Sequence, residues 1–297
     1  MYNISAVSSL TGVNPITLRA WERRYGLIKP TRTPKGHRLY SENDISTINQ
    51  VVKLLEQGIA ASQVGHYLNQ QGITPTETGN PWQVYQERMH QAVINFDEPA
   101  LEKIYNEAMA LYPVSLVTRE LLVPLLRALG DRWQSQQRGV GEEHFFAVFM
   151  RNKLGSRFHH RNLNNRGPKI LAACLPGEHH ELGLLLFSLA AHERDYRIIL
   201  LGANMPIDEL PDIAIHTRCV AIVLSVSTSE NLQQLAHEIT MLVGEVRIPV
   251  FIGGNVTRNN SSLIQKTGAI AAGDDIGESL HTINQYLQQH KPAGDAK

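Results

Sequence analysis

The residues from 177 to 183, which read GEHHELG, combine two histidines with two glutamates. An imidazole can bind a metal ion through one ring nitrogen, and a nearby carboxylate can orient the other nitrogen. Glu178 stands two residues before His180, and Gly183 follows three residues after it. A pair of histidines in a polar loop is usually only solvated, so the stretch by itself favours a solvated loop over a metal site.

Two more places along the chain carry small residues that suit a ligand site. Ser225 and Ser227 alternate, so in an extended segment both lie on one face and can donate hydrogen bonds. Gly253 and Gly254 are adjacent, and their lack of a Cβ leaves room for a ligand beside the main chain. If these residues lie close to His180, they favour the ligand site.

The elements that must position these residues are short apolar runs separated by helical stretches. The apolar runs span 169–176, 197–203, 219–227 and 246–254, and helical patterns occupy 183–194 and 230–245. This alternation predicts a Rossmann-like, doubly wound parallel sheet with helices on both faces. Ligands bind such sheets at the carboxyl ends of the strands, which is where 177–183, 225–227 and 253–254 fall.

The chain before the sheet is helical. The pattern from about 83 to 161 predicts a four-helix bundle. Polar joints that contain Gly and Pro, at 72–82 and 162–168, separate the bundle from its neighbours. We therefore expect three domains, namely a winged helix-turn-helix head over 1–75, a helical bundle over 76–163 and a sheet domain over 164–297.

The head shows clear helix boundaries. Residues 4–11 predict a short helix that Gly12 ends, and Asn14 can cap a second helix that begins at Pro15 and runs to about residue 25. The Pro- and Gly-containing segment that follows predicts a small hairpin, or wing, and two further helices complete the head. This order is that of a winged helix-turn-helix domain.

Positive charge is concentrated in this head, although the whole chain is neutral. Residues 1–75 hold eight lysines and arginines against four acidic residues, a net charge of +4, so the rest of the chain carries −4. Such a cluster indicates a polyanionic partner, against the alternative of a solvated basic face. The residues expected to contact DNA are Thr17, Arg19, Arg23, Arg24 and Tyr25 on the second helix and Arg32, Lys35, His37 and Arg38 in the wing.

Several classes of protein are disfavoured. No apolar run reaches the roughly 18–20 residues of a membrane span, and no secretory signal is visible at the N-terminus. Cys174 and Cys219 lie apart in apolar runs, which predicts buried thiols and neither a disulfide nor a zinc site. We expect a cytoplasmic protein with no membrane partner.

The segment NPITLRAWERRYGLIKPTRTPKGHRLYSENDI, which starts at Asn14, closely resembles the DNA-binding domain of MerR-type transcription regulators. The resemblance covers about residues 3–71. It implies binding to double-stranded promoter DNA as a dimer, with the second helix in the major groove and the wing on the backbone.

The acidic-x-His-x-x-Gly, Ser-Val-Ser and Gly-Gly motifs occur in the order typical of a cobalamin-binding domain, over about 169–290. The resemblance implies that His180 is the lower cobalt ligand and that Glu178 supports it. The benzimidazole tail of the cofactor would run past Ser225, Ser227, Gly253 and Gly254. Many members have Asp where this chain has Glu178.

The bundle also carries Trp133, followed after nine residues by Glu143 and His144, a spacing that resembles the adenosylcobalamin photoreceptors with a MerR-type head. In those proteins these residues lie at the upper face of the cofactor. A histidine expected just after the tryptophan is replaced by Gln134, a poor cobalt ligand beside imidazole.

The resemblance as a whole implies an adenosylcobalamin-dependent, light-responsive repressor that binds DNA as a homodimer or homotetramer in the dark. Two alternatives remain open, a light-independent regulator that senses cobalamin or haem and, from another class, a corrinoid-carrying methyltransferase module. The MerR-type head disfavours the methyltransferase module. Because no catalytic array is visible, we expect no enzymatic turnover.

Overall fold

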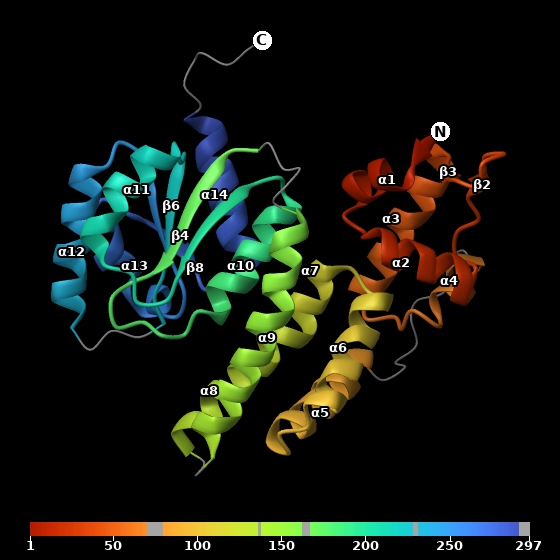
Figure 1. Cartoon of the computed structure of the whole chain (residues 1–297), viewed down its shortest axis with the longest axis horizontal. Coiled ribbons are helices and arrows are strands. Elements are labelled where there is room, and N and C mark those ends of the chain that lie inside the picture. The colour runs from red at the N-terminus through yellow and green to blue at the C-terminus, as the bar shows by residue number, and fades with distance from the viewer. Residues whose placement is uncertain (70–79, 136–137, 162–166, 228–230, 291–297) are drawn as a thin grey trace. The chain divides into compact units, whose positions relative to one another are not determined.

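The computed structural model describes residues 1–69, 80–135, 138–161, 167–227 and 231–290 (Figure 1). The chain divides into two compact units, Met1–Phe149 and Met150–Lys297, and each is described by itself. The predicted domain boundaries at 75/76 and 163/164, and most of the predicted joints, lie outside the described residues. The three-domain division therefore stays a prediction.

The head of the first unit is a small helical domain with a three-stranded antiparallel sheet in the order β1-β3-β2. Its elements are β1 (Tyr2–Asn3), α1 (Ile4–Thr11), α2 (Pro15–Ala20), a π-helical turn (Trp21–Tyr25), β2 (Thr31–Arg32), β3 (Arg38–Tyr40), α3 (Glu42–Glu56) and α4 (Val64–Asn69). The predicted helices and the wing hairpin β2–β3 are confirmed, whereas the pairing of β1 with β3 was not predicted.

Local side-chain chemistry explains where the second helix of the head begins. The side chain of Asn14 accepts hydrogen bonds from the backbone N–H groups of Ile16 and Thr17, and Pro15 occupies the first helical position. Gly12 ends α1 in the left-handed conformation with φ of 69°, which costs glycine little. The tight turn between the two helices thus follows directly from the residues Gly12 to Pro15.

A run of helices follows in the same unit, as the sequence predicts. They are α5 (Pro81–Ile94), α6 (Glu98–Leu111), α7 (Val114–Val117), a π-helical turn (Thr118–Leu122), α8 (Val123–Ser135) and α9 (Gly139–Arg161), the last of which extends into the second unit. The π-helical turn joins α7 to α8 without a break in the helical path.

Pro124 accounts for this irregularity. A proline inside a helix has no N–H to donate to the carbonyl four residues earlier, here that of Glu120. The side chain of Gln86 on α5 supplies the missing donor, with its Nε2 2.6 Å from the Glu120 carbonyl oxygen. The interaction between α5 and the π-helical turn thus satisfies the carbonyl that the proline leaves without a helical partner.

The second unit contains a parallel sheet of five strands among the described residues, in the order β5-β4-β6-β7-β8 (Figure 1). The strands are β4 (Lys169–Cys174), β5 (Arg197–Gly202), β6 (Ala221–Ser225), β7 (Val250–Gly253) and β8 (Ile270–Gly273). The first four were predicted. The fifth was missed because its residues, IAAG, form a short run with only one large apolar side chain.

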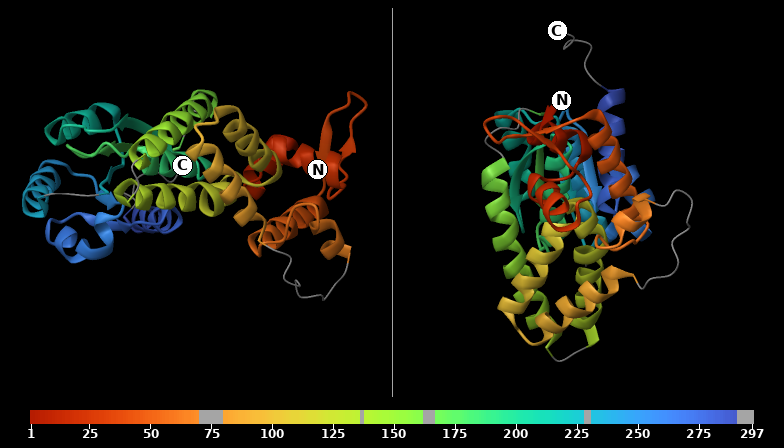
Figure 2. Two further views of the ribbon diagram at one scale, coloured as in Figure 1. Left: turned by 90° about the horizontal axis from the view of Figure 1, so that it is seen from below. Right: turned by 90° about the vertical axis from the view of Figure 1, so that its right-hand side faces the viewer.

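Helices cover both faces of this sheet, which confirms the doubly wound architecture (Figure 2). They are α10 (Leu182–Glu193), α11 (Leu210–Thr217), α12 (Leu232–Glu245), α13 (Val256–Lys266) and α14 (Ile276–Gln289). Alternate residues of β4 divide between two cores. Leu171 and Ala173 pack with α11, α12 and α13, and Ile170 and Ala172 pack with α10 and α14. Burial on both faces explains the continuous apolar runs.

The strand order places a topological switch point between β4 and β6, because the chain leaves β4 for β5 on one side and returns to β6 on the other. In sheets of this type the crevice outside the carboxyl ends of the two central strands is the usual ligand site. Glu178 follows β4 and Ser227 follows β6, so the predicted ligand residues lie at this crevice.

The predictions about cysteines and membrane spans also have structural counterparts. Cys174 and Cys219 are both buried free thiols, as expected, and burial raises the pKa of the Cys174 thiol to about 12. Within the described part of the chain, no helix combines the length and the apolar character needed to cross a bilayer.

Candidate functional site

The loop that follows β4 is held by the segment that follows β5. Asn204 accepts a hydrogen bond from the N–H of Gly177 at 2.8 Å, and its own N–H donates to the carbonyl of Glu178 at 3.0 Å. Glu181, the second glutamate of the GEHHELG stretch, forms an ion pair with Arg151. These contacts fix the main chain on either side of His180.

The carboxylate of Glu178 is the centre of the site. Its side chain is only 2% exposed. One oxygen accepts the backbone N–H of His180 at 2.7 Å and lies 2.7 Å from the Nδ1 atom of the same residue. The other oxygen accepts the backbone N–H of Ser227 at 2.5 Å. The buried glutamate therefore ties the loop after β4 to the end of β6 at the switch point.

The electrostatics of this carboxylate determine the tautomer of His180. Burial alone would raise the pKa of Glu178, but the hydrogen bonds from His180 and Ser227 outweigh it and lower the pKa to about 2. The carboxylate is therefore ionised near neutral pH and can only accept, so Nδ1 of His180 donates to it. A metal ion at this imidazole must then be bound through Nε2.

The donor set around His180 restricts the kind of metal site. The described residues contain no group of three or more His, Cys, Asp or Glu side chains that could hold a metal ion by themselves. An ion bound to His180 would therefore need ligands beyond the side chains that the structure describes. A tetrapyrrole-type cofactor such as cobalamin meets this requirement, and the imidazole side chain, which is 43% exposed, is accessible to one.

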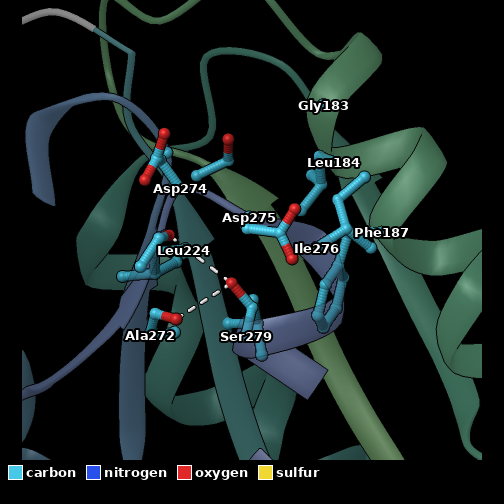
Figure 3. A pocket seen from close by; sticks show the side chains of 14 residues that line it. Gly183, Leu184, Phe187, Leu224, Ala272, Asp274, Asp275, Ile276 and Ser279 are labelled. Carbon is cyan, nitrogen blue, oxygen red and sulfur yellow. Dashed lines mark hydrogen bonds between the residues drawn. The ribbon is translucent and has the colours of Figure 1, made fainter. Parts of the chain in front are cut away.

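A groove beside this loop has the small-residue lining that the sequence predicts (Figure 3). Gly183, Ser225, Gly253 and Gly254 all line it. A Cβ at Gly254 would stand 2.4 Å from the carbonyl oxygen of Val226, and its φ of +101° is unfavourable for other residues. The close approach of these two loops therefore requires glycine.

The structure places some site residues differently from the expectation. Ser227 does not line the groove, and its backbone N–H binds Glu178 instead. The groove also includes Phe187 of α10 and Ser279 of α14, which the sequence analysis missed. Ser279 donates a hydrogen bond to the Ala272 carbonyl at 3.0 Å (Figure 3). No sequence signal was found for this wall, because β8 was not predicted.

The residues expected at the upper face of a cofactor belong to the other unit. Trp133 is on α8, but its side chain and that of Gln134 lie outside the described residues. Glu143 is half-buried and His144 is exposed in the first two turns of α9. Their grouping with His180 around one cofactor stays a prediction.

In the head, the basic residues of the second helix are available to a partner. Arg19, Arg23 and Arg24 are exposed, and Tyr25 is half-buried. Thr17 is a wrong prediction as a DNA contact, because it is fully buried. Its Oγ1 accepts from Asn14 Nδ2 at 2.9 Å and donates to a carbonyl at the end of α6.

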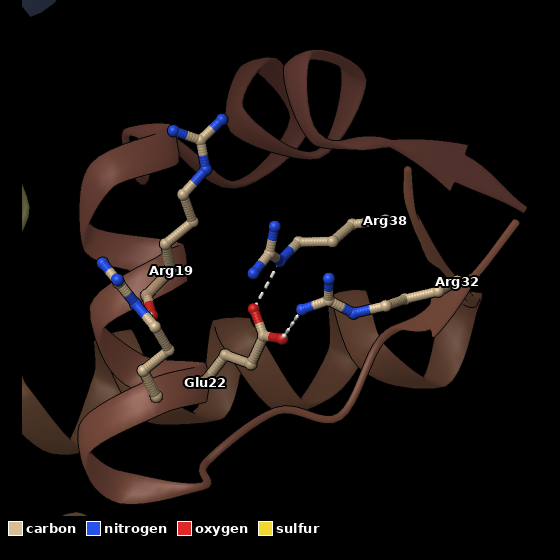
Figure 4. Close-up of polar contacts among 5 residues, drawn as sticks. Arg19, Glu22, Arg32 and Arg38 are labelled. Atoms are coloured by element: carbon tan, nitrogen blue, oxygen red, sulfur yellow. Dashed lines mark hydrogen bonds and ion pairs between the residues drawn. The ribbon is translucent and has the colours of Figure 1, made fainter. Parts of the chain in front are cut away.

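The wing residues divide into two groups. Lys35 and His37 are exposed near the hairpin turn. Arg38 and Arg32 instead contact Glu22, with Arg38 Nε 2.5 Å and Arg32 Nη2 3.1 Å from its carboxylate oxygens (Figure 4). Both arginines therefore have an acidic partner within the protein. Their predicted contact with phosphate would have to compete with Glu22. Glu22 was not singled out from the sequence.

Comparison with known proteins agrees with this architecture. Residues 2–71 match the MerR HTH family regulatory protein family. Residues 85–157 and residues 168–283 match two families that are each described as a B12 binding domain.

Curated relatives match along nearly the whole chain. The HTH-type transcriptional repressor CarH of Myxococcus xanthus is 30% identical over 277 residues, which cover 89% of this chain and 92% of the relative. The repressor CarA of the same organism is 27% identical over 269 residues, which cover 90% of this chain and 91% of the relative. Both are transcriptional repressors by name.

Among solved structures, the monomethylamine corrinoid protein of Methanosarcina barkeri is similar with a TM-score of 0.58 and 16% identity. The similarity covers 69% of this chain and 99% of that protein, and at this identity it shows a shared fold. The curated relatives that match nearly the whole chain are transcriptional regulators. The chain is therefore a transcriptional regulator and not an enzyme. It belongs to the family of MerR-type helix-turn-helix repressors with B12-binding domains that includes CarH and CarA.

Proposed function

We propose that this regulator binds adenosylcobalamin and that light weakens its hold on DNA. The observation that carries the proposal is the contact of the buried Glu178 carboxylate with both His180 and the end of β6, beside a groove of small residues. This arrangement prepares one imidazole nitrogen for a metal and leaves space along the sheet for an extended group.

In the proposed complex, His180 binds cobalt through Nε2. Glu178 keeps the imidazole in the required tautomer and increases its basicity, since its carboxylate accepts the Nδ1 proton. The groove lined by Ser225, Gly253 and Gly254 would hold the benzimidazole tail of the cofactor. By the family resemblance, Trp133, Glu143 and His144 would contact the upper face of the cofactor.

Adenosylcobalamin supplies a cobalt–carbon bond that green light breaks. The conformation of the protein would depend on whether the adenosyl group is present. A ligand that binds one of two conformations more tightly shifts the population toward that conformation. In the dark, the chains form a homodimer or homotetramer whose heads bind double-stranded promoter DNA together. Linked heads gain affinity through their effective concentration, so loss of the oligomer releases DNA.

The test uses the full-length chain reconstituted with adenosylcobalamin in the dark. We would record the absorption spectrum, the mass by size-exclusion chromatography with light scattering, and the affinity for a duplex selected by the protein from a random library. We expect all three to change after green light in the native chain, and we expect H180A to bind the cofactor much more weakly. A native chain that keeps its mass and DNA affinity after photolysis would contradict the proposal.

Gln134 favours a second candidate, a regulator that responds to cobalamin itself and not to light. Position 134 carries glutamine in place of a histidine, and glutamine binds cobalt more weakly than imidazole does. This side chain would therefore not stabilise cobalt after the adenosyl group is lost. This candidate predicts that apo-protein and cobalamin-loaded protein differ in DNA affinity, with no further change on illumination. Reconstitution with haem in the same assay tests the tetrapyrrole alternative.

A further inference from the structure

Two helices of the first unit are joined by a bidentate ion pair next to the proposed upper-face residues. Arg132 Nε and Nη2 lie 2.8 Å and 3.1 Å from the two carboxylate oxygens of Glu142. Arg132 directly precedes Trp133 on α8, and Glu142 directly precedes Glu143 on α9. The pair therefore connects the two short segments that carry the predicted signature.

The surroundings make this ion pair stronger than an ordinary surface contact. The side chain of Glu142 is 4% exposed and that of Arg132 is 28% exposed. Arg132 lies in the last turn of α8 and Glu142 in the first turn of α9. Each charge therefore also interacts favourably with its own helix dipole. The two parallel hydrogen bonds restrict geometry more than a single contact does.

A second contact fixes how α9 is rotated about its axis. Phe96, in the turn after α5, packs its ring against that of Phe145 with centroids 5.4 Å apart. A Cβ on Gly141 would lie 3.7 Å from the same ring. Since successive residues turn by about 100° around a helix, Glu142 projects to the side of this contact and Glu143 projects to nearly the opposite side.

We infer that Arg132 and Glu142 are positioning residues that hold Glu143, the neighbour of Glu142 on α9, in the orientation that recognises an adenosyl group. This inference rests on the proposed function, which places Trp133 and Glu143 at the upper face of cobalamin. The ion pair connects the last turn of α8 with the first turn of α9, and the Phe96 ring packs against Phe145 on another side of α9. Recognition of a ligand requires such support, because a small displacement of the contacting groups is enough to lose it.

The experiment compares two cobalamins that differ in the upper ligand. Binding of adenosylcobalamin and of hydroxocobalamin to the full-length chain would be measured in the dark by equilibrium dialysis. We expect E142Q to reduce the preference for adenosylcobalamin by about tenfold, the loss expected when one hydrogen bond to the ligand is misplaced. The affinity for hydroxocobalamin, which depends on His180 and the groove, should stay unchanged.

The chain provides a matched control in the same unit. Arg88 and Glu107 form a partly exposed ion pair between α5 and α6, with Arg88 Nη2 and Glu107 Oε2 3.0 Å apart. E107Q should leave the ratio of the two affinities unchanged even if it lowers the melting temperature as much as E142Q does. If E107Q changes the ratio equally, the effect is one of general stability and the inference is wrong.

A milder variant covers the case in which E142Q folds poorly. R132K keeps the positive charge but loses the planar fork that makes two parallel hydrogen bonds. It should retain the fold and show an intermediate loss of preference. A native chain with no preference for adenosylcobalamin would overturn the proposed function. A native chain with a clear preference that R132K and E142Q both retain would overturn only the role of the ion pair.

Discussion

At the scale of single residues, Glu178 determines the chemistry of the candidate site. Its carboxylate is buried, yet three hydrogen-bonding contacts keep it ionised. The same contacts orient His180 and connect the ends of β4 and β6. An aspartate at this position would be one methylene shorter and would reach these donors from a different place on the loop.

E178Q should lower the affinity for cobalamin by roughly 10-fold to 100-fold, because support of a metal-binding histidine by a carboxylate is usually worth that much. The amide can keep a hydrogen bond but cannot carry the charge that fixes the His180 tautomer. Equilibrium dialysis with hydroxocobalamin measures the change. E245Q, at the exposed end of α12, is the control, and equal affinities for native chain and E178Q would refute the assigned role.

G254A should destabilise the second unit by more than about 1 kcal/mol, since both the steric clash and the positive φ oppose a side chain there. G244A, in the exposed last turn of α12 with no atom near its Cβ, should stabilise by about 0.5–1 kcal/mol. Urea unfolding of the two variants measures these opposite signs. A neutral G254A would show that the loop after β7 can move away from Val226.

At the scale of elements, the wing and the second helix of the head act together through Glu22. This carboxylate lies between Arg32 of β2 and Arg38 of β3 (Figure 4), and the two arginines lower its pKa although burial opposes them. An acidic group on a DNA-binding surface repels phosphate. It also keeps the wing in a defined place relative to the helix.

E22Q should therefore raise the affinity for random duplex DNA and reduce the preference for the selected operator. Removal of one negative charge leaves Arg32 and Arg38 for phosphates, so the slope of log affinity against log salt should steepen by about one to two units. Fluorescence anisotropy at several salt concentrations measures this slope. E56Q, at the exposed end of α3, should leave the slope unchanged, and an unchanged slope in E22Q would contradict the proposed competition.

At the scale of the whole molecule, acidic residues with lowered pKa values occur in both units. Glu22, Glu107 and Glu142 each have an arginine partner, and Glu178 is held by backbone and imidazole donors. Because the folded pKa of each is below its unfolded value near 4.5, their contribution to stability is complete above that pH. It is lost as the pH falls through the lower folded values.

Acidification from pH 6 to pH 3 should therefore lower the melting temperature, with most of the loss below about pH 4.5. Replacement of Glu142 or Glu178 by glutamine should lower the melting temperature at pH 6 and reduce its further fall at low pH. Differential scanning calorimetry measures both. A melting temperature that rises on acidification would mean that the sign of these contributions is wrong.

The order of motifs, the helix boundaries and the doubly wound sheet were readable from the sequence because each depends on local chemistry. Asn14 caps the second helix and Pro15 fits its first position, Gly12 ends the first helix, and continuous apolar runs mark buried parallel strands. The same locality explains the failure at β8. Its residues carry too little apolar surface to indicate a strand. The strand forms because its backbone pairs with that of β7, which is a contact between segments distant in the sequence.

The sequence alone determined which residue types the site contains and the family to which they point. Only the tertiary structure decided which atoms meet. Ser227 binds Glu178 through its backbone, 49 positions away, and Thr17 turns inward to α6 while Arg19 stays exposed. Glu22 engages two arginines of the wing. These contacts join segments far apart in the chain, and their geometry depends on how helices and strands pack, which no local pattern of residues encodes.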